Sequence, residues 1–197
     1  ERSNFFATEE MRYTLGRPNW LDAVIVEQRA VRGAVGIFDQ TSFGKLFVRG
    51  RDALALLERV CANSIDVAVG QVVYSAMLNR KGGFESDITV QRLAADAFFL
   101  VTGSAQPVRD FAWLRRHAAH GEDVRIEDVT DRWSVISLLG PNADAVLAKI
   151  SFKEGTRAVP ASYVGGPGWE FYVPVEDAAA LYDRLWSAGD ALGIRDC

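Results

Sequence analysis

The stretch Val48-Arg49-Gly50-Arg51-Asp52-Ala53, residues 48–53, decides the fold, because it returns in altered form at residues 138–143. The second copy reads Leu138-Leu139-Gly140-Pro141-Asn142-Ala143. In each copy a run suited to a strand ends at a glycine, an alanine follows three residues later, and apolar residues follow six and seven residues after the glycine. Glycine punctuates structure and the later spacing is helical, so each copy predicts a strand followed by a short helix.

The residues around the first copy predict a hairpin and a second helix. β-branched and aromatic runs are typical of strands, and paired glycines adopt positive φ at low cost in a tight turn. Proline suits the first turn of a helix, where its missing N–H costs least. We expect strands at Phe43–Val48, Val72–Leu78, Phe84–Leu93 and Phe98–Thr102, a turn at Arg80-Lys81-Gly82-Gly83, and helices over Ala53–Val60 and Pro107–His117, the latter with Val108, Phe111, Ala112 and Arg115 on one side.

The second copy is followed by a similar series. Strands are expected at Arg157–Tyr163 and Trp169–Val173 and a helix over Asp177–Ser187, so the order strand–helix–strand–strand–helix occurs twice. This order predicts an α+β fold of two ferredoxin-like split βαβ units packed together. Residues 1–197 are expected to form one domain with sub-units at 22–130 and 131–197, and a further helix is expected from Asp22, with Asp22 as its N-cap.

Composition excludes several classes of protein. The chain has 197 residues, 49% of them hydrophobic and 24% charged, with a net charge of −4, which is typical of a soluble globular protein. No apolar run approaches the ~20 residues of a membrane span, and the acidic balance argues against nucleic acid and membrane partners. Two cysteines cannot build a disulfide framework. We expect a reducing location, the cytoplasm or, in a eukaryote, the mitochondrial matrix.

Asp87 is the first candidate functional residue. It follows the Gly82-Gly83 turn on a strand whose neighbours Ile88 and Val90 are apolar, and strand alternation places it on the face opposite Ser86 and Ile88. A carboxylate in such surroundings can accept a hydrogen bond from an amine and assist proton transfer. A solvated aspartate at a strand edge also fits the pattern and, from the pattern alone, is favoured.

Other polar clusters carry weaker signals. The Gly-rich turn within Tyr163–Glu170 lets a ligand approach the backbone but precedes no helix, so it is no phosphate loop, and an ordinary hairpin is favoured. His117 and His120 lie three residues apart near a helix end without a third ligand in spacing, so solvated histidines are favoured and no metal site is expected. Cys61 closes an apolar helix face and is expected to be a small core residue.

Several motifs, in order along nearly the whole chain, resemble the folate-binding region of dimethylglycine and sarcosine dehydrogenases. That region is in turn similar to the aminomethyltransferase (T-protein) of the glycine cleavage system. The motifs are Gly16-Arg17-Pro18-Asn19-Trp20, Gly36-Ile37-Phe38-Asp39-Gln40-Thr41-Ser42-Phe43, Cys61-Ala62-Asn63, Tyr74-Ser75-Ala76-Met77-Leu78-Asn79, Gly82-Gly83-Phe84-Glu85-Ser86-Asp87-Ile88-Thr89-Val90 and Ser162-Tyr163-Val164-Gly165.

This resemblance implies a tetrahydrofolate site. Asp87 matches the aspartate that contacts the folate nitrogens in the family and is the implied catalytic residue, and Tyr74 matches a tyrosine that lines the pterin. Tyr163 and Glu170 match the tyrosine and glutamate that bind the pterin ring, which suits a carboxylate that accepts paired N–H donors. The implied cofactor-binding residues are Tyr74, Asp87, Val101, Thr102, Tyr163 and Glu170, of which Val101 and Thr102 lie on a strand that borders the site in the family.

The implied activity is tetrahydrofolate-dependent one-carbon transfer. The one-carbon unit would come from oxidative demethylation of an N-methylated amine such as dimethylglycine or sarcosine. The implied partner is an FAD-dependent oxidase domain or subunit, with FAD in an upstream domain that this chain lacks. A non-catalytic folate-binding or structural subunit of an amine-oxidising complex is the alternative, and demethylation of another donor, such as a sulfonium, is a third reading.

The sequence departs from the family pattern at several points. Ser86 stands where aminomethyltransferases usually have the first of two acidic residues, and the turn reads Gly165-Gly166-Pro167-Gly168 where many relatives have Gly-Glu-Leu-Gly. The stretch between Ile150 and Arg157 is shorter than expected. The chain also stops at Cys197, before the helix whose arginine binds folate and before the C-terminal barrel. We therefore expect a truncated aminomethyltransferase folate-binding fold, incomplete at the C-terminus.

Overall fold

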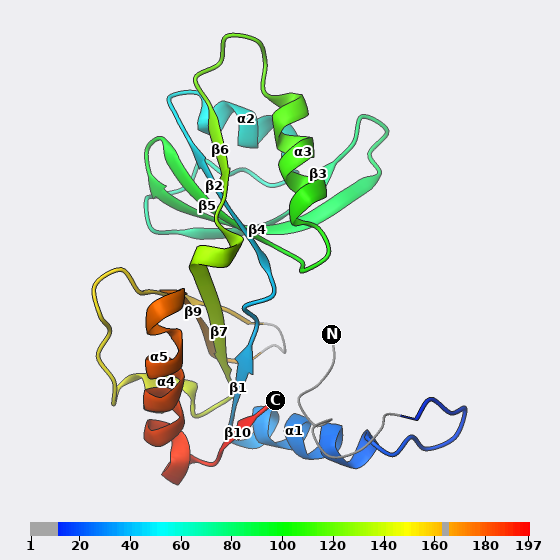
Figure 1. Ribbon diagram of the computed structural model, residues 1–197, viewed down its shortest axis with the longest axis vertical. Helices are drawn as coiled ribbons and strands as arrows, with labels where there is room; N and C mark the ends of the chain where they lie inside the picture. Colours follow the sequence, from blue (N-terminus) through cyan, green and yellow to red (C-terminus); the bar gives the residue numbers. More distant parts are fainter. Residues whose placement is uncertain (1–11, 163–165) are drawn as a thin grey trace. The chain divides into compact units, whose positions relative to one another are not determined.

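The computed structural model describes residues 12–162 and 166–197, which form two compact units. The central unit is Ser42–Trp133, and the terminal unit combines the described residues 12–41 with 134–162 and 166–197 (Figure 1). Each unit has its own five-stranded sheet and its own hydrophobic core. The α+β class and the two-unit organisation expected from the repeated order are confirmed.

The central unit contains a ferredoxin-like split βαβ arrangement with one added strand. Its sheet has the strand order β3-β4-β5-β2-β6, and every pairing for which a register is resolved is antiparallel. Without β3, this is the order in which two crossovers, β2-α2-β4 and β5-α3-β6, interleave. Its elements are β2 (Gly44–Arg49), α2 (Ala53–Val60), β3 (Val72–Leu78), β4 (Phe84–Ala94), β5 (Ala97–Thr102), α3 (Pro107–His117), β6 (Arg125–Asp128) and the 3₁₀ turn η2 (Thr130–Arg132).

The core of the central unit lies between its sheet and the helices α2 and α3. All four apolar residues predicted to face it from α2, namely Ala53, Leu56, Leu57 and Val60, are buried. Burying a leucine side chain contributes about 1.5–3 kcal/mol, so this short helix is held mainly by packing.

The buried side of α3 differs from the prediction. The helix buries Asp110 and Leu114, and Val108 is 80% exposed. Apolar spacing alone could not reveal this orientation, because a carboxylate occupies one of the inward positions.

The terminal unit repeats the arrangement with an inserted strand. Its strand order is β10-β1-β7-β9-β8, in which β1 separates β7 from β10. Its elements are α1 (Leu21–Gly33), β1 (Val35–Asp39), β7 (Trp133–Leu139), α4 (Ala143–Leu147), β8 (Arg157–Pro160), β9 (Gly168–Pro174), α5 (Val175–Gly189), the 3₁₀ turn η3 (Asp190–Leu192) and β10 (Ile194–Asp196).

The structure divides the chain differently from the expected sub-units at 22–130 and 131–197, because residues 12–41 group with the C-terminal part. Strand β1 pairs antiparallel with β7, where Gly36 lies opposite Leu139, and parallel with β10, where Val35 lies opposite Ile194. Such pairing joins residues more than a hundred positions apart, which a local pattern does not register. Helix α1 also begins earlier than predicted, with Trp20 as its N-cap residue and Asp22 inside the first turn.

The two copies of the repeated motif adopt the same local structure, as predicted. Gly50 and Gly140 end their strands with φ of 126° and 131°. In each copy the alanine N–H three residues later donates to the glycine carbonyl, over 2.9 Å at Ala53 and 3.0 Å at Ala143. Residues other than glycine rarely adopt this backbone conformation, so glycine is required at both turns.

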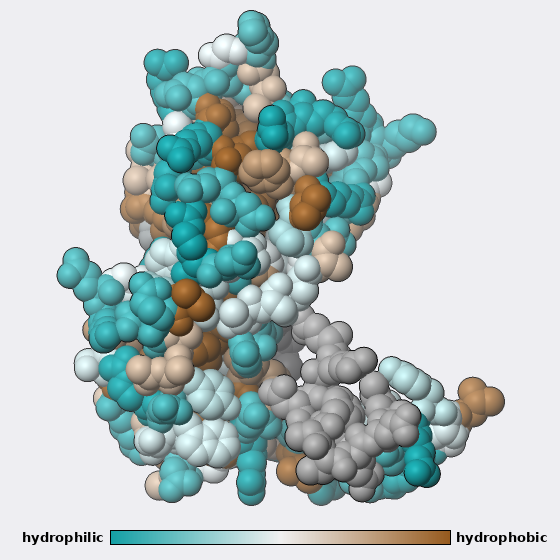
Figure 2. Space-filling model, viewed as in Figure 1, coloured by the Kyte–Doolittle hydropathy of each residue, from teal (hydrophilic) through white to brown (hydrophobic). Residues whose placement is uncertain are grey.

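The visible surface is mainly hydrophilic (Figure 2). In the space-filling view, hydrophilic residues cover most of the visible surface and apolar residues are scattered among them (Figure 2). Within the described part of the chain, no helix combines the length and apolar character that crossing a bilayer requires.

Candidate functional site

Asp87 and Tyr74 form a hydrogen-bonded pair on the central sheet. Asp87 is exposed on β4, while its neighbours Ser86 and Ile88 are buried on the side that faces the helices, as predicted. Tyr74, on the adjacent strand β3, is 64% exposed, and its hydroxyl donates to Asp87 Oδ2 over 3.2 Å. The sheet face that carries this pair, opposite the helices, is called the Asp87 face.

The pair has a defined electrostatic character. The hydrogen bond to Asp87 and the negative charge of that carboxylate raise the pKa of the Tyr74 phenol above its ordinary value. Within the described part of the chain, Asp87 Oδ1 accepts no hydrogen bond. One carboxylate oxygen is therefore oriented by Tyr74, and the other is open to a donor from a bound molecule.

The hairpin that precedes Asp87 is closed by Asn79 rather than by the paired glycines alone. Asn79 Oδ1 accepts hydrogen bonds from the backbone N–H groups of Lys81 and Gly83, each over 3.0 Å. Gly82 has φ of 74°, whereas Gly83 does not use positive φ and instead packs against the Asn79 side chain. The turn sets the register in which Ala76 lies opposite Asp87, and a one-residue slip would move Asp87 to the other face.

The structure separates the two predicted residues of β5. Val101 lies opposite Thr89, which in turn lies opposite Tyr74, so Val101 belongs to the Asp87 face. Thr102 lies opposite Ile88 on the helix side, where its hydroxyl donates to the buried Asp110 carboxylate. Tyr74, Asp87 and Val101 are thus brought to one face, and Thr102 is not.

Lys45 is a residue of this face that sequence reasoning missed. It lies opposite Val101 on β2, and its side chain is fully buried. Lysine is almost never fully buried, so a charge within the aromatic and aliphatic run Phe43–Val48 was the available signal. Asp110 was also missed, and its position carried no such signal, because the apolar spacing predicted a different side of its helix to face the core.

The remaining predicted residues belong to the terminal unit. Glu170 is buried on β9 and accepts a hydrogen bond from the hydroxyl of Tyr172, which lies on the same side of the strand. Arg157 lies opposite Tyr172 on β8, with its guanidinium carbon 5.8 Å from the Tyr172 ring centroid. Tyr163 lies outside the described residues, so its predicted position is not compared.

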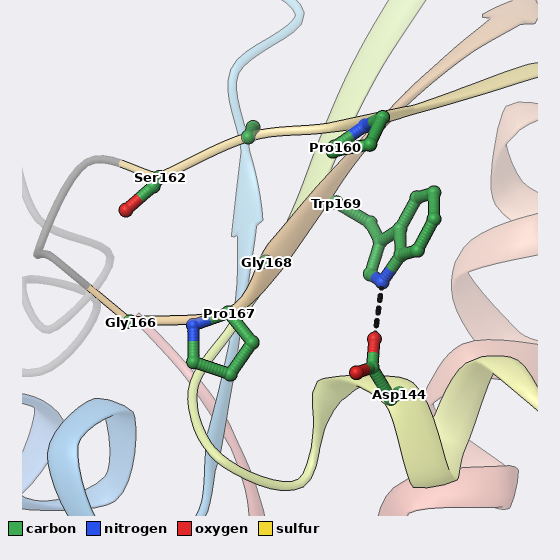
Figure 3. Close-up of a pocket in the computed structure, with 8 residues that line it drawn as sticks. Asp144, Pro160, Ser162, Gly166, Pro167, Gly168 and Trp169 are labelled. Carbon is green, nitrogen blue, oxygen red and sulfur yellow. Dashed lines mark hydrogen bonds between the residues drawn. The ribbon is translucent and has the colours of Figure 1, made fainter.

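A surface pocket of about 380 Å³ lies beside the Gly-rich turn of the terminal unit (Figure 3). The Trp169 indole points toward helix α4 and donates to Asp144 Oδ1 over 2.7 Å (Figure 3). Successive residues of a strand point to opposite faces, so this pocket and the Glu170 carboxylate lie on different sides of β9. The pocket therefore does not include Glu170.

The described residues offer neither a group of metal ligands nor a reactive thiolate. Among residues 12–162 and 166–197, no group of three or more His, Cys, Asp and Glu side chains could hold a metal ion. His117 contacts Trp113, with ring centroids 4.3 Å apart. Burial raises the pKa of both Cys61 and Cys197 to about 12, so neither is a thiolate at neutral pH.

The fold is that of an aminomethyltransferase. The solved structure of glycine cleavage system aminomethyltransferase T from Bartonella henselae superposes with a TM-score of 0.79 and 25% identity, covering 95% of this chain and 55% of that one. The GCVT N-terminal domain family matches residues 1–157. The chain therefore belongs to the GCVT N-terminal domain family.

Curated relatives include proteins of different kinds. The chain is 38% identical to the aminomethyltransferase of Chlorobium chlorochromatii over 87% of its length, and 34% identical to the mitochondrial dimethylglycine dehydrogenase of Mus musculus over 95%. It is also 32% identical, over 95%, to the mitochondrial pyruvate dehydrogenase phosphatase regulatory subunit of Mus musculus. The chain spans 52% of the first relative and 24% of each of the other two.

Proposed function

We propose that this chain binds tetrahydrofolate and serves tetrahydrofolate-dependent one-carbon transfer. The one-carbon unit would be captured from the oxidative demethylation of an N-methylated amine such as dimethylglycine or sarcosine. The observation that carries the proposal is the Tyr74–Asp87 pair, which presents an exposed, oriented carboxylate on a sheet of the aminomethyltransferase fold. The names of the dehydrogenase and aminomethyltransferase relatives support the same reaction class.

The residues fit the chemistry of a reduced pterin. A pterin offers N–H donors, and the open Oδ1 of Asp87 is an acceptor for one of them. Tyr74 has an exposed ring beside that carboxylate, and aromatic rings stack on such heterocycles. When bound, tetrahydrofolate would supply the nucleophilic nitrogens that take up the one-carbon unit.

Each proposed residue has a separate task. Asp87 would hold the folate nitrogen by a hydrogen bond and accept its proton, while Tyr74 keeps the carboxylate oriented. Val101 would provide an apolar wall on the same face. Glu170, with Tyr163, would bind the pterin ring by accepting its paired N–H groups. Thr102, which lies on the helix side, is assigned no contact with folate.

The proposal includes a flavin-dependent partner. In the dehydrogenase class, the oxidation that releases the one-carbon unit needs an electron acceptor, and we assign it to FAD in an oxidase domain or subunit. The reducing location expected from composition, the cytoplasm or a mitochondrial matrix, agrees with the mitochondrial names of two relatives.

One comparison favours a second function, that of a non-catalytic regulatory or structural subunit. A relative at 32% identity is named as the regulatory subunit of a phosphatase. In that case folate binding could persist while Asp87 would have no effect on any rate. The two functions are therefore distinguished by a substitution at Asp87.

We expect the protein to bind a tetrahydrofolate analogue and not FAD. Calorimetric titration with each ligand measures this directly. Asp87→Ala should abolish the heat of binding of the tetrahydrofolate analogue, because it removes the acceptor that holds the folate nitrogen. Asp96→Ala is the matched control, since Asp96 is an exposed carboxylate in the β4–β5 turn of the same sheet. Tight FAD binding without a folate signal would overturn the proposal.

A further inference from the structure

Asp87 lies just beyond the point where β4 loses one of its two neighbouring strands. The ladder between β4 and β5 ends at Ile88, which lies opposite Thr102, the last residue of β5. From Asp87 toward the hairpin, β4 is paired only with β3, and the register of that pairing shifts between Met77 and Leu78. Backbone pairing alone therefore holds this part of β4 on one side only.

A buried carboxylate takes the place of the missing neighbour. Asp110, on α3, is 1% exposed, and its Oδ2 accepts a hydrogen bond from Ser86 Oγ over 2.8 Å. The same oxygen accepts a hydrogen bond from the Thr102 hydroxyl. Ser86 precedes Asp87 on β4 and Thr102 ends β5, so one carboxylate joins the two strands at the point where their ladder stops.

The buried Asp110 carboxylate depends on the hydrogen bonds that it accepts. Burial raises the pKa of the Asp110 carboxyl, and the hydrogen bonds from Thr102 and Ser86 oppose that rise. The nearby charge of Arg109 also opposes it, whereas the charge of Asp87 adds to it. A carboxylate in a core is costly unless its hydrogen bonds are satisfied, so both hydroxyls are needed.

We infer that Asp110 is the positioning residue of the Asp87 site. Its carboxylate holds Ser86 and Thr102 together from the helix side and thereby fixes the segment of β4 that carries Asp87 toward Tyr74. Asp110 itself lies on the opposite side of the sheet from Asp87 and acts only through the strand. The inference rests on the proposed function only for the effect on folate.

The Tyr74 phenol reports the position of Asp87 without any ligand. Its pKa is raised because it donates to that carboxylate, so a displaced Asp87 lets the pKa fall toward the ordinary value. The Tyr74 ionisation can be followed by NMR of ¹³C-labelled tyrosine, with Tyr74→Phe to assign the signal. Asp87→Ala, which removes both the acceptor oxygen and the negative charge, defines the full size of the decrease.

Asp110→Ala is expected to lower the Tyr74 pKa by most of that full decrease. Ser86→Ala and Thr102→Val should lower it in part, because each removes one side of the bridge, and they also test the inference if Asp110→Ala does not fold. Asp110→Asn keeps an acceptor oxygen and should recover most of the raised pKa. An unchanged Tyr74 pKa in the two hydroxyl variants would overturn the inference.

Leu114→Ala is the matched control. Leu114 is a fully buried residue of the same helix, and its truncation destabilises the core while it removes none of the hydrogen bonds of the bridge. It should lower the melting temperature and leave the Tyr74 pKa unchanged. A Tyr74 pKa that follows stability in every variant, Leu114→Ala included, would reduce Asp110 to a general structural residue.

A second readout links the bridge to folate. Because small displacements at a site cost affinity and rate steeply, Asp110→Ala should raise the dissociation constant of a tetrahydrofolate analogue about tenfold or more. Leu114→Ala should not. If the unmodified protein binds no folate, the proposed function fails, while the Tyr74 titration still decides whether Asp110 positions Asp87.

Discussion

Asp87→Asn is expected to lower the rate of one-carbon transfer by about 10²-fold or more, at an almost unchanged melting temperature. Asparagine keeps the size of the side chain and one acceptor oxygen. The hydrogen bond from Tyr74 and the packing of this exposed side chain therefore survive. It loses the negative charge and the ability to accept a proton, which are the two properties that the proposed role requires. An exposed residue without that role would change stability by no more than ~0.5 kcal/mol and leave the rate alone.

The measurement compares methylenetetrahydrofolate formation with free formaldehyde release in the full natural protein. Asp87→Asn should shift the products toward formaldehyde, because the one-carbon unit is released when the acceptor nitrogen is poorly held. Asp96→Asn, a change of the same kind on an exposed turn of the same sheet, should leave the product ratio unaltered. An unaltered ratio in Asp87→Asn as well would remove the catalytic assignment and favour the regulatory or structural function.

Gly50→Ala is expected to be the most destabilising single substitution at a turn, costing about 3 kcal/mol or more. Two effects add. The backbone at Gly50 has φ of 126°, a conformation that residues other than glycine rarely adopt. A Cβ on this residue would also lie 2.1 Å from the carbonyl oxygen of Asp123. Backbone cannot rotate away as a side chain can, so the β2–α2 turn itself has to shift. Gly140→Ala should behave similarly, because its Cβ would lie 2.6 Å from the carbonyl oxygen of Ala34.

Urea unfolding of Gly50→Ala and of the control Gly70→Ala separates the cost of backbone strain from the cost of the steric clash with Asp123. Gly70 has φ of 91°, and a Cβ built on it meets nothing within 4 Å, so Gly70→Ala carries the strain alone and should cost about 1–2 kcal/mol. A Gly50→Ala midpoint equal to that of Gly70→Ala would show that the close approach to Asp123 does not constrain the turn.

Local chemistry singles out Asp87, but from the pattern alone a solvated aspartate is favoured, and only the resemblance to the family makes Asp87 the leading site residue. Asp87 could be singled out because a glycine turn and alternating apolar neighbours place one carboxylate on a defined face of a strand, and the motif around Tyr74 supported it. Thr102 is grouped with Val101 by the resemblance, because both lie on a strand that borders the site in the family. Strand alternation sends the two side chains to opposite faces, and the register with β4 decides which of them belongs with Asp87.

Lys45 and Asp110 were missed for a different reason. Charged residues in strands and helices are expected to be solvated, and only packing shows that these two are buried. Asp110 gains its role from Ser86, 24 residues away, and Thr102, eight residues away, through side-chain contacts that no local spacing encodes.

Short-range constraints alone, namely glycine backbone freedom, helical apolar spacing and strand alternation, predicted the repeated order strand–helix–strand–strand–helix, the position of the Asp87 hairpin and the α+β class, but not the strands β1, β6 and β10. These effects act within a few residues and are visible in the chain itself. The insertion of β1 between β7 and β10, the buried carboxylate of Asp110 and the face on which each side chain of β5 lies were decided only by the tertiary structure. They depend on which distant strands pair and in what register, because that choice balances burial and backbone hydrogen bonding over the whole sheet.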